Sequence, residues 1–188
     1  MSNQLSIEEI VKGCKKGNPK YQKALVDRFS EQLYTVCLRY IGESNRAQDV
    51  LQDSFIRIFK AINNYDPDRG SLGGWMRKIT VNMSLKTLNK KKIKTTGLEI
   101  DLHNMVSVAP TALSRMANEE LLEIVQTLPE GYRQVFNLSV IEGYNHREIG
   151  EMLGIKEVSS RSNLSRAKEI LRKKLKVFKN SELWVNII

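Results

Sequence analysis

The sequence predicts an all-α protein with two helical domains joined by a flexible linker. Apolar residues recur at intervals of three and four in several segments, which is the pattern of helices with one buried face. No segment shows the sustained alternation of β-branched and polar residues that is typical of strands. Residues 93–112 lack helical periodicity and contain Pro110, which indicates a linker. We therefore assign residues 1–92 to the first domain and residues 113–188 to the second.

The first domain is expected to contain four helices. Residues 21–41 predict a long helix, and residues 5–16 a shorter one ahead of it. The segment 46–62 carries an apolar stripe formed by Ala47, Val50, Leu51, Phe55, Ile58, Phe59 and Ile62. Turn-forming residues then end this helix, namely Asn63, Asn64, Asp66, Pro67 and Gly70. A fourth helix over 72–90 is expected to bury Leu72, Met76, Ile79 and Met83.

The second domain is expected to contain a helix-turn-helix motif. Helices are predicted over 113–127, which ends before Pro129 because proline disfavours helix in the preceding residue, and over 131–141. Two further helices, over 146–153 and 157–175, flank a short turn with helix-turn-helix spacing. The residues expected at their crossing are small or apolar: Ile149, Gly150, Leu153 and Ile155. The residues expected to face the core from the last helix are Leu164, Ala167, Leu171 and Leu175.

The charge distribution predicts a polyanionic partner. The chain has a net charge of +9 and a pI near 9.6, so nucleic acid or an anionic membrane surface would attract it. Residues 113–160 carry four basic and eight acidic groups, whereas residues 161–188 carry eight and two. The positive charge of the second domain therefore begins where its last helix exposes its polar face.

The sequence gives no indication of enzymatic chemistry. Cys14 and Cys37 lack zinc-site spacing, the only histidines are His103 and His146, and phosphate-binding or nucleophile motifs are absent. We expect no catalytic activity, no metal, no cofactor and no small-molecule substrate. No apolar run approaches the roughly 20 residues that span a bilayer, and the first residues do not resemble a secretory signal. We therefore expect a cytoplasmic protein that is not inserted in a membrane.

The last helix carries the candidate residues for duplex DNA. Its polar positions suit phosphates and base edges in a major groove, and they comprise Arg161, Ser162, Asn163, Ser165, Arg166 and Lys168. The alternative interpretation is a structural helical hairpin with a solvated basic face near its C-terminus, where the helix dipole favours cations.

The helix over 72–90 carries a second candidate surface. Trp75, Lys78, Asn82, Lys86 and Asn89 share one helical face, and no acidic residue lies between positions 77 and 92. Aromatic, amide and basic groups together suit unpaired DNA, because bases stack on rings and amides bind exposed base edges. For the ring of Trp75 taken alone, a place in the core is the favoured interpretation.

The helix over 46–62 presents a different polar face. Asp49, Gln52, Asp53, Ile56 and Lys60 lie opposite the apolar stripe. Ile56 stands among polar neighbours, and single exposed apolar residues are common on protein surfaces. Two interpretations therefore stay open, an incidental exposed isoleucine and the centre of a small protein-binding patch.

Two motifs resemble regions of one transcription factor family. The segments AQDVLQDSFIRIFKAINNYDPDRGSLGGWMRKITVN and LPEGYRQVFNLSVIEGYNHREIGEMLGI are similar, in this order, to regions 2 and 4 of extracytoplasmic-function (ECF) RNA polymerase sigma factors. In that family, region 2 binds core RNA polymerase and opens the −10 element, and region 4 binds the −35 element. The resemblance implies a function in promoter-specific, DNA-dependent transcription initiation. The partners that it implies are core RNA polymerase, promoter DNA and, for some members of the family, an anti-sigma factor.

The resemblance also implies roles for individual residues. Polymerase contacts fall on Asp49, Gln52, Asp53 and Ile56. Contacts with the −10 element fall on the loop from Asn63 to Ser71, which includes Asn64, Tyr65 and Arg69, and on Asn82; Trp75 and Lys78 join these candidates because they share the helical face of Asn82. Contacts with the −35 element fall on the last helix, chiefly Arg161, Ser162, Ser165 and Arg166, with Asn163 and Lys168 beside them.

The chain departs from the family pattern at a few positions. Val158-Ser159-Ser160 stands where the family usually has Gly-Thr-Val, Lys86 and Asn89 replace an acid and an arginine, and Gln48 replaces a frequent acid.

The alternative function is a helix-turn-helix regulator that binds an operator without joining polymerase. The apolar segment 183–188 either packs on the second domain or meets a regulator.

Overall fold

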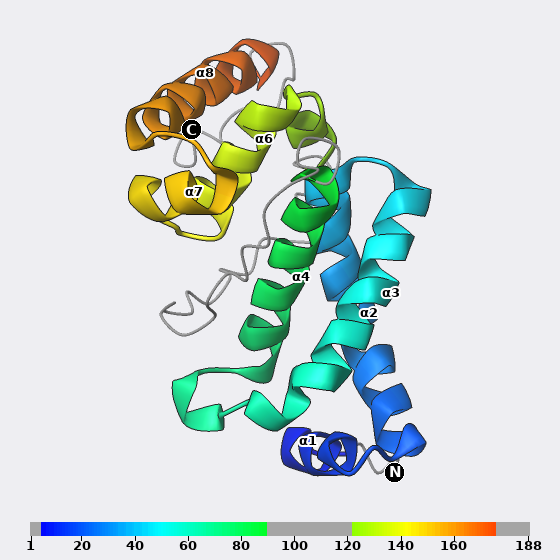
Figure 1. Ribbon diagram of the computed structural model, residues 1–188. Helices are drawn as coiled ribbons and strands as arrows, with labels where there is room; N and C mark the ends of the chain where they lie inside the picture. Colours follow the sequence, from blue (N-terminus) through cyan, green and yellow to red (C-terminus); the bar gives the residue numbers. More distant parts are fainter. Residues whose placement is uncertain (1–4, 90–121, 176–188) are drawn as a thin grey trace. The chain divides into compact units, whose positions relative to one another are not determined.

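The computed structural model describes residues 5–89 and 122–175, and it shows an all-helical protein (Figure 1). The predicted fold class is confirmed, because no strand occurs among these residues. The described residues fall into two compact units, the first over 5–89 and the second over 122–175. The expected linker and the segments 113–121 and 183–188 lie outside the described residues, so the domain boundaries stay predictions.

The first unit contains the four expected helices. These are α1 (Ile7–Lys15), α2 (Pro19–Ile41), α3 (Ser44–Ala61) and α4 (Leu72–Asn89). Two short 3-10 helices, η1 (Ile62–Asn64) and η2 (Pro67–Arg69), lie in the connection between α3 and α4. Helices α2, α3 and α4 lie side by side, and α1 lies across one end of them, against the start of α2 and against η1 (Figure 1).

Local sequence explains where these helices begin and end. Ser6 and Glu9 form a reciprocal capping box at α1, which satisfies two backbone N–H groups that the first turn leaves unpaired. Asn18 caps α2, and Pro19 at its first position has no N–H group to lose. Gly42 ends α2 in a left-handed conformation with φ of 81°, which a residue without a Cβ atom adopts at low cost.

The core of the first unit lies between α2, α3 and α4. Its fully buried members include Leu25, Leu33, Ile58, Leu72 and Met76. Helix α4 is buried more widely than the predicted stripe, since Val81, Leu85 and Leu88 are also buried. Thr80 and Ser84 are buried too, and their hydroxyl groups donate to the backbone carbonyls of Met76 and Thr80 at 3.0 and 2.8 Å. Helix α4 therefore buries polar side chains by pairing them with its own backbone.

The second unit contains the remaining helices. Residues 122–126 are helical and are followed by α6 (Glu130–Phe136), α7 (His146–Leu153) and α8 (Glu157–Leu175). The predicted helix over 131–141 is present, but its second half is not α-helical, because Asn137–Ile141 forms a π-helical turn, η3. The backbone N–H of Glu142 donates to the carbonyl of Asn137 at 2.9 Å, a bond that spans five residues. The core of this unit comprises Ile124, Val125, Leu128, Phe136, Ala167 and Leu171.

The described helices do not cross a membrane. None of those in residues 5–89 and 122–175 is both long enough and apolar enough to span a bilayer.

Candidate DNA-binding and protein-binding surfaces

Helices α7 and α8 form the helix-turn-helix expected from the sequence. A capping box of Asn145 and Glu148 begins α7, and Gly154 ends it with φ of 66°. The backbone N–H groups of Gly154 and Ile155 both donate to the carbonyl of Gly150. A Cβ atom at Gly150 would lie 2.8 Å from the carbonyl oxygen of Ile155, which is closer than such atoms approach in proteins. The turn is therefore tight, and its geometry depends on glycine at both positions.

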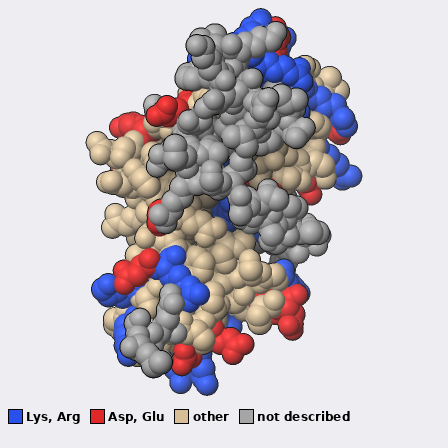
Figure 2. All heavy atoms as spheres, turned by 180° about the vertical axis from the view of Figure 1, so that it is seen from behind, with Lys and Arg blue, Asp and Glu red and all other residues tan. Residues whose placement is uncertain are grey.

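The buried side of α8 determines which side chains face solvent. Ser160, Ala167 and Leu171 are buried against the rest of the unit. Four of the six candidate residues for duplex DNA are exposed, namely Arg161, Ser162, Ser165 and Arg166. The other two, Asn163 and Lys168, are half-buried at the margins of that face. Lys and Arg side chains gather along the edge of the molecule where α8 lies (Figure 2).

The two arginines of this face have partners within the unit. Arg161 forms an ion pair with Glu157 one turn earlier on α8, and both side chains are largely exposed. Arg166 donates to the hydroxyl oxygen of Tyr132 in α6 at 3.3 Å, and this hydrogen bond raises the pKa of the guanidinium. The phenol therefore restricts where the Arg166 side chain points, although Tyr132 itself is 34 residues away in sequence.

A histidine and a serine connect the two helices of the motif. Nδ1 of His146 lies 2.9 Å from the hydroxyl oxygen of Ser160, and Ser160 is fully buried. Desolvation lowers the pKa of His146, the positive charge of Arg161 lowers it further, and Glu157 opposes both effects. The pair joins the first residue of α7 to the first turns of α8, so it fixes the start of α8 relative to α7.

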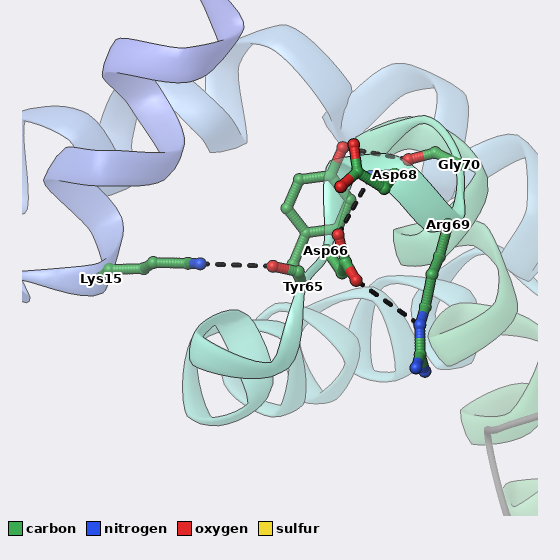
Figure 3. A network of polar contacts seen from close by, with 6 residues as sticks. All are labelled: Lys15, Tyr65, Asp66, Asp68, Arg69 and Gly70. Carbon is green, nitrogen blue, oxygen red and sulfur yellow. Dashed lines mark hydrogen bonds and ion pairs between the residues drawn. The ribbon is translucent and has the colours of Figure 1, made fainter.

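The connection between α3 and α4 is held by a network of polar contacts (Figure 3). Nζ of Lys15 in α1 donates to the carbonyl of Tyr65 at 3.2 Å, and the Tyr65 hydroxyl donates to the carbonyl of Gly70 at 3.1 Å. Asp66 accepts from the backbone N–H of Asp68 and pairs with Arg69 at 3.5 Å. The loop is thus folded before any ligand arrives.

The candidate residues of this loop differ in exposure. Asn63 and Asn64 are exposed on η1, and Arg69 is exposed beside Asp66. Tyr65 is only 8% exposed, and its ring lies against that of Trp75 with 5.5 Å between the ring centroids. Tyr65 packs in the core cluster of the first unit, so its ring offers little surface for a base to stack on.

Helix α4 places three candidate residues at the edge of the core. Trp75 is half-buried and packs against the core cluster, which agrees with the interpretation of this ring as core and leaves part of it accessible. Lys78 is half-buried, and desolvation lowers its pKa. Oδ1 of Asn82 is buried and has no hydrogen-bond partner among the described residues. A buried amide oxygen without a partner is costly, and an incoming donor can satisfy it.

Helix α3 presents the candidate protein-binding surface. Asp49, Gln52 and Asp53 are exposed, and Ile56 beside them is 48% exposed. Ala47, Val50, Phe55 and Ile58 on the opposite side are buried. The acidic and amide groups with one central apolar side chain therefore stand together on the solvent side of α3.

Sequence reasoning missed Tyr132, His146 and Val158. The contacts of Tyr132 with Arg166 and of His146 with Ser160 join residues of different helices, and no local spacing indicates them. Val158 is 72% exposed on α8, whereas an apolar residue is ordinarily expected on the buried side.

No group of acidic, histidine or cysteine side chains suited to a metal ion occurs in the described parts of the chain.

The fold and surfaces define a class of protein, a helix-turn-helix DNA-binding protein with a second helical unit. Two family models match the chain, Sigma-70 region 2 over residues 25–93 and Sigma-70 region 4 over residues 118–171. Together they cover more than half of the sequence. The chain belongs to the sigma-70 family, in its ECF group.

Two relatives of similar sequence are named as members of this family. The ECF RNA polymerase sigma factor SigW of Bacillus subtilis is 27% identical over 189 residues, covering 92% of this chain and 98% of the relative. The ECF RNA polymerase sigma factor SigE of Mycolicibacterium smegmatis is 31% identical over 154 residues, covering 79% of this chain and 59% of the relative. A solved structure of the sigma factor RpoE with the anti-sigma factor NepR from Bartonella quintana is 16% identical, covers 84% of this chain and 98% of that one, and has a TM-score of 0.49.

Proposed function

We propose that this protein is a promoter-specificity factor that binds core RNA polymerase in the cytoplasm and directs it to start transcription at defined promoters. The second unit binds duplex DNA of the −35 element, and the first unit binds polymerase and captures bases of the −10 element. The observation that carries the proposal is the helix-turn-helix within the region 4 match, whose α8 exposes Arg161, Ser162, Ser165 and Arg166.

The exposed face of α8 has the chemistry that duplex DNA requires. An arginine side chain can donate two hydrogen bonds to the O6 and N7 atoms of guanine in the major groove. Serine hydroxyls bind phosphates or base edges at short range. In this proposal, Arg161, near the start of α8, reaches base edges, and Arg166, positioned by Tyr132, anchors the helix on the groove.

Binding energy must open the −10 element, because neither unit's sequence contains a nucleotide-binding motif. Disrupting DNA stacking costs about 1.4 kcal/mol for each base-pair step, with a few kcal/mol more for a base turned out of the helix. The folded loop between α3 and α4 lowers the entropy cost of capturing such bases. Asn63, Asn64 and Arg69 on the loop and Lys78 and Asn82 on α4 are the proposed contacts.

Asn82→Ala tests the −10 part of the proposal. The change removes an amide whose buried Oδ1 lacks a partner in the free protein, so the variant is expected to fold. We expect at least tenfold weaker open-complex formation, measured by permanganate reactivity of unpaired thymines, with unchanged binding to core polymerase. Asn45→Ala, an exposed change at the start of α3, is the matched control and should open promoters normally. Normal opening by Asn82→Ala would remove Asn82 from the mechanism.

Reconstituted transcription tests the function as a whole. Purified protein and core polymerase are incubated with a promoter library, and the transcripts are sequenced to locate their start points. We expect starts at a shared pair of elements that core polymerase alone does not use. Tight operator binding by the protein alone, without stimulated initiation, would instead identify a helix-turn-helix regulator that acts without polymerase.

We further propose an anti-sigma partner that covers the Ile56 surface of α3 and so prevents docking on polymerase.

A further inference from the structure

Val158 has an exposure that the fold does not explain. It is 72% exposed, and Ile56 is the only other large apolar residue so classed in the part of the chain that the structure describes. The core cluster of the second unit does not include Val158. Isolated apolar residues on surfaces are common, so the exposure alone would mean little. What distinguishes Val158 is its position on α8.

Val158 lies in the first turn of α8, on the face opposite the core. Successive residues of a helix are 100° apart, so Val158 shares a face with residues three, four and seven positions later. Those residues are Arg161, Ser162 and Ser165, and all three are exposed. The buried positions Ser160, Ala167 and Leu171 point the other way. An apolar side chain therefore lies within the polar surface that the proposed function assigns to DNA.

Local forces do not favour valine at this place. A β-branched residue is a poorer helix former than alanine, because the preceding turn restricts its side chain. Its neighbours on both sides, Glu157 and Ser159, are polar and exposed, as expected for the start of a helix. Val158 thus contributes little to the folding of the second unit, and its chemistry is available to a ligand.

The major groove of DNA offers one apolar group to such a side chain. Thymine carries a 5-methyl group there, and the other base-edge groups are hydrogen-bond donors or acceptors. The first residues of the second helix are those that approach base edges in helix-turn-helix proteins. We propose that Val158 contacts the methyl group of a thymine in the −35 element and makes this protein prefer thymine at that position. The inference rests on the proposed binding of α8 to duplex DNA.

Deoxyuridine tests this contact, because it pairs as thymidine does and lacks only the methyl group. Holoenzyme assembled from the full-length protein and core polymerase selects a duplex from a library randomised in the −35 region. Each thymine of that duplex is then replaced singly by deoxyuridine. We expect about fourfold weaker binding at one position, the factor expected for losing one buried methyl group. Val158→Ala should bind the thymine and deoxyuridine duplexes equally at this position.

Two control measurements distinguish a contact with the methyl group from an effect on folding. Val158→Ala introduces a better helix former at an exposed position, so its thermal stability should equal or exceed that of the wild type. Ser159→Ala changes the neighbouring exposed residue, and it should keep the preference for thymine. The inference is overturned if wild type and Val158→Ala show the same preference for the methyl group, or if the wild type shows no such preference at any position. In both cases sequence selection by α8 would still stand. Failure to select any sequence overturns the proposed function, and this inference with it.

Discussion

Gly13 fixes the junction between α1 and α2. A Cβ atom at this position would overlap the ring and Cβ atom of Tyr21. We expect Gly13→Ala to lower the free energy of unfolding of the first unit by about 1–3 kcal/mol, the usual cost of forcing extra atoms into a packed site. Urea unfolding followed by circular dichroism measures the change. Gly73→Ala is the matched control, because its Cβ would make an ordinary 3.4 Å contact with Phe29. Equal stability of Gly13→Ala and wild type would show that α1 can move away without cost.

His146 makes the stability of the second unit depend on pH. Its folded-state pKa lies below the ordinary value, chiefly through desolvation, so protons bind the unfolded chain more readily. The stability contributed by the neutral ring is present above the unfolded pKa of about 6.5 and is lost as the pH falls below it. We expect the thermal midpoint to drop more between pH 7.5 and 5.5 in wild type than in His146→Gln. Parallel pH profiles of the two proteins would contradict this assignment.

At the scale of single elements, α3 has a buried face and an exposed face of different chemistry. Its buried side holds the core, and its exposed side presents Ile56 with Asp49, Gln52 and Asp53. We expect Ile56→Asp to weaken binding to core polymerase at least tenfold, because a new charge would be desolvated at the centre of the contact. Size-exclusion chromatography of mixtures measures the association. Lys20→Asp places the same side chain on an exposed part of α2 and should leave binding intact. Undiminished association of Ile56→Asp would exclude the α3 surface.

Helix positions were predictable where a helix has a regular apolar stripe or clear end signals. The apolar stripe from Ala47 to Ile62 indicated α3. Helix α7 begins after Asn145 and ends at Gly154, as these two residue types suggest. The π-helical turn at η3 was missed, since an added residue in a turn shifts the register without changing composition. Helix α4 is buried on more sides than one stripe indicates, because Thr80 and Ser84 conceal their polarity in hydrogen bonds.

The candidate sites were predictable only in part. Exposure of Arg161, Ser162, Ser165 and Arg166 follows from helical geometry once the apolar side of α8 is known. The burial of Tyr65 and the partnership of Tyr132 with Arg166 depend on contacts between separate helices. Such contacts leave no periodic pattern in the sequence, so they require a structure. The contacts of all these residues with DNA or polymerase stay predictions.

At the scale of the whole molecule, each unit has a hydrophobic core of its own. We therefore expect the two units to unfold as separate cooperative transitions. Gly13→Ala should lower the midpoint of the first unit's transition in differential scanning calorimetry and leave the other transition unchanged, because the atoms that a Cβ at Gly13 would meet belong to Tyr21 of the first unit. A single transition that shifts as one would show that the units stabilise each other.

The ion pair between Glu157 and Arg161 has a consequence for how the protein would search a genome. A guanidinium that already has an acidic neighbour gains less binding free energy when it meets a DNA backbone phosphate. The attraction of this helix to non-specific duplex DNA is therefore reduced. A target that offers the guanidinium two well-placed acceptors compensates for breaking the pair, and other sequences do not. Because random sites outnumber promoters by many orders of magnitude, shorter residence on each of them leaves more molecules free to find the correct one.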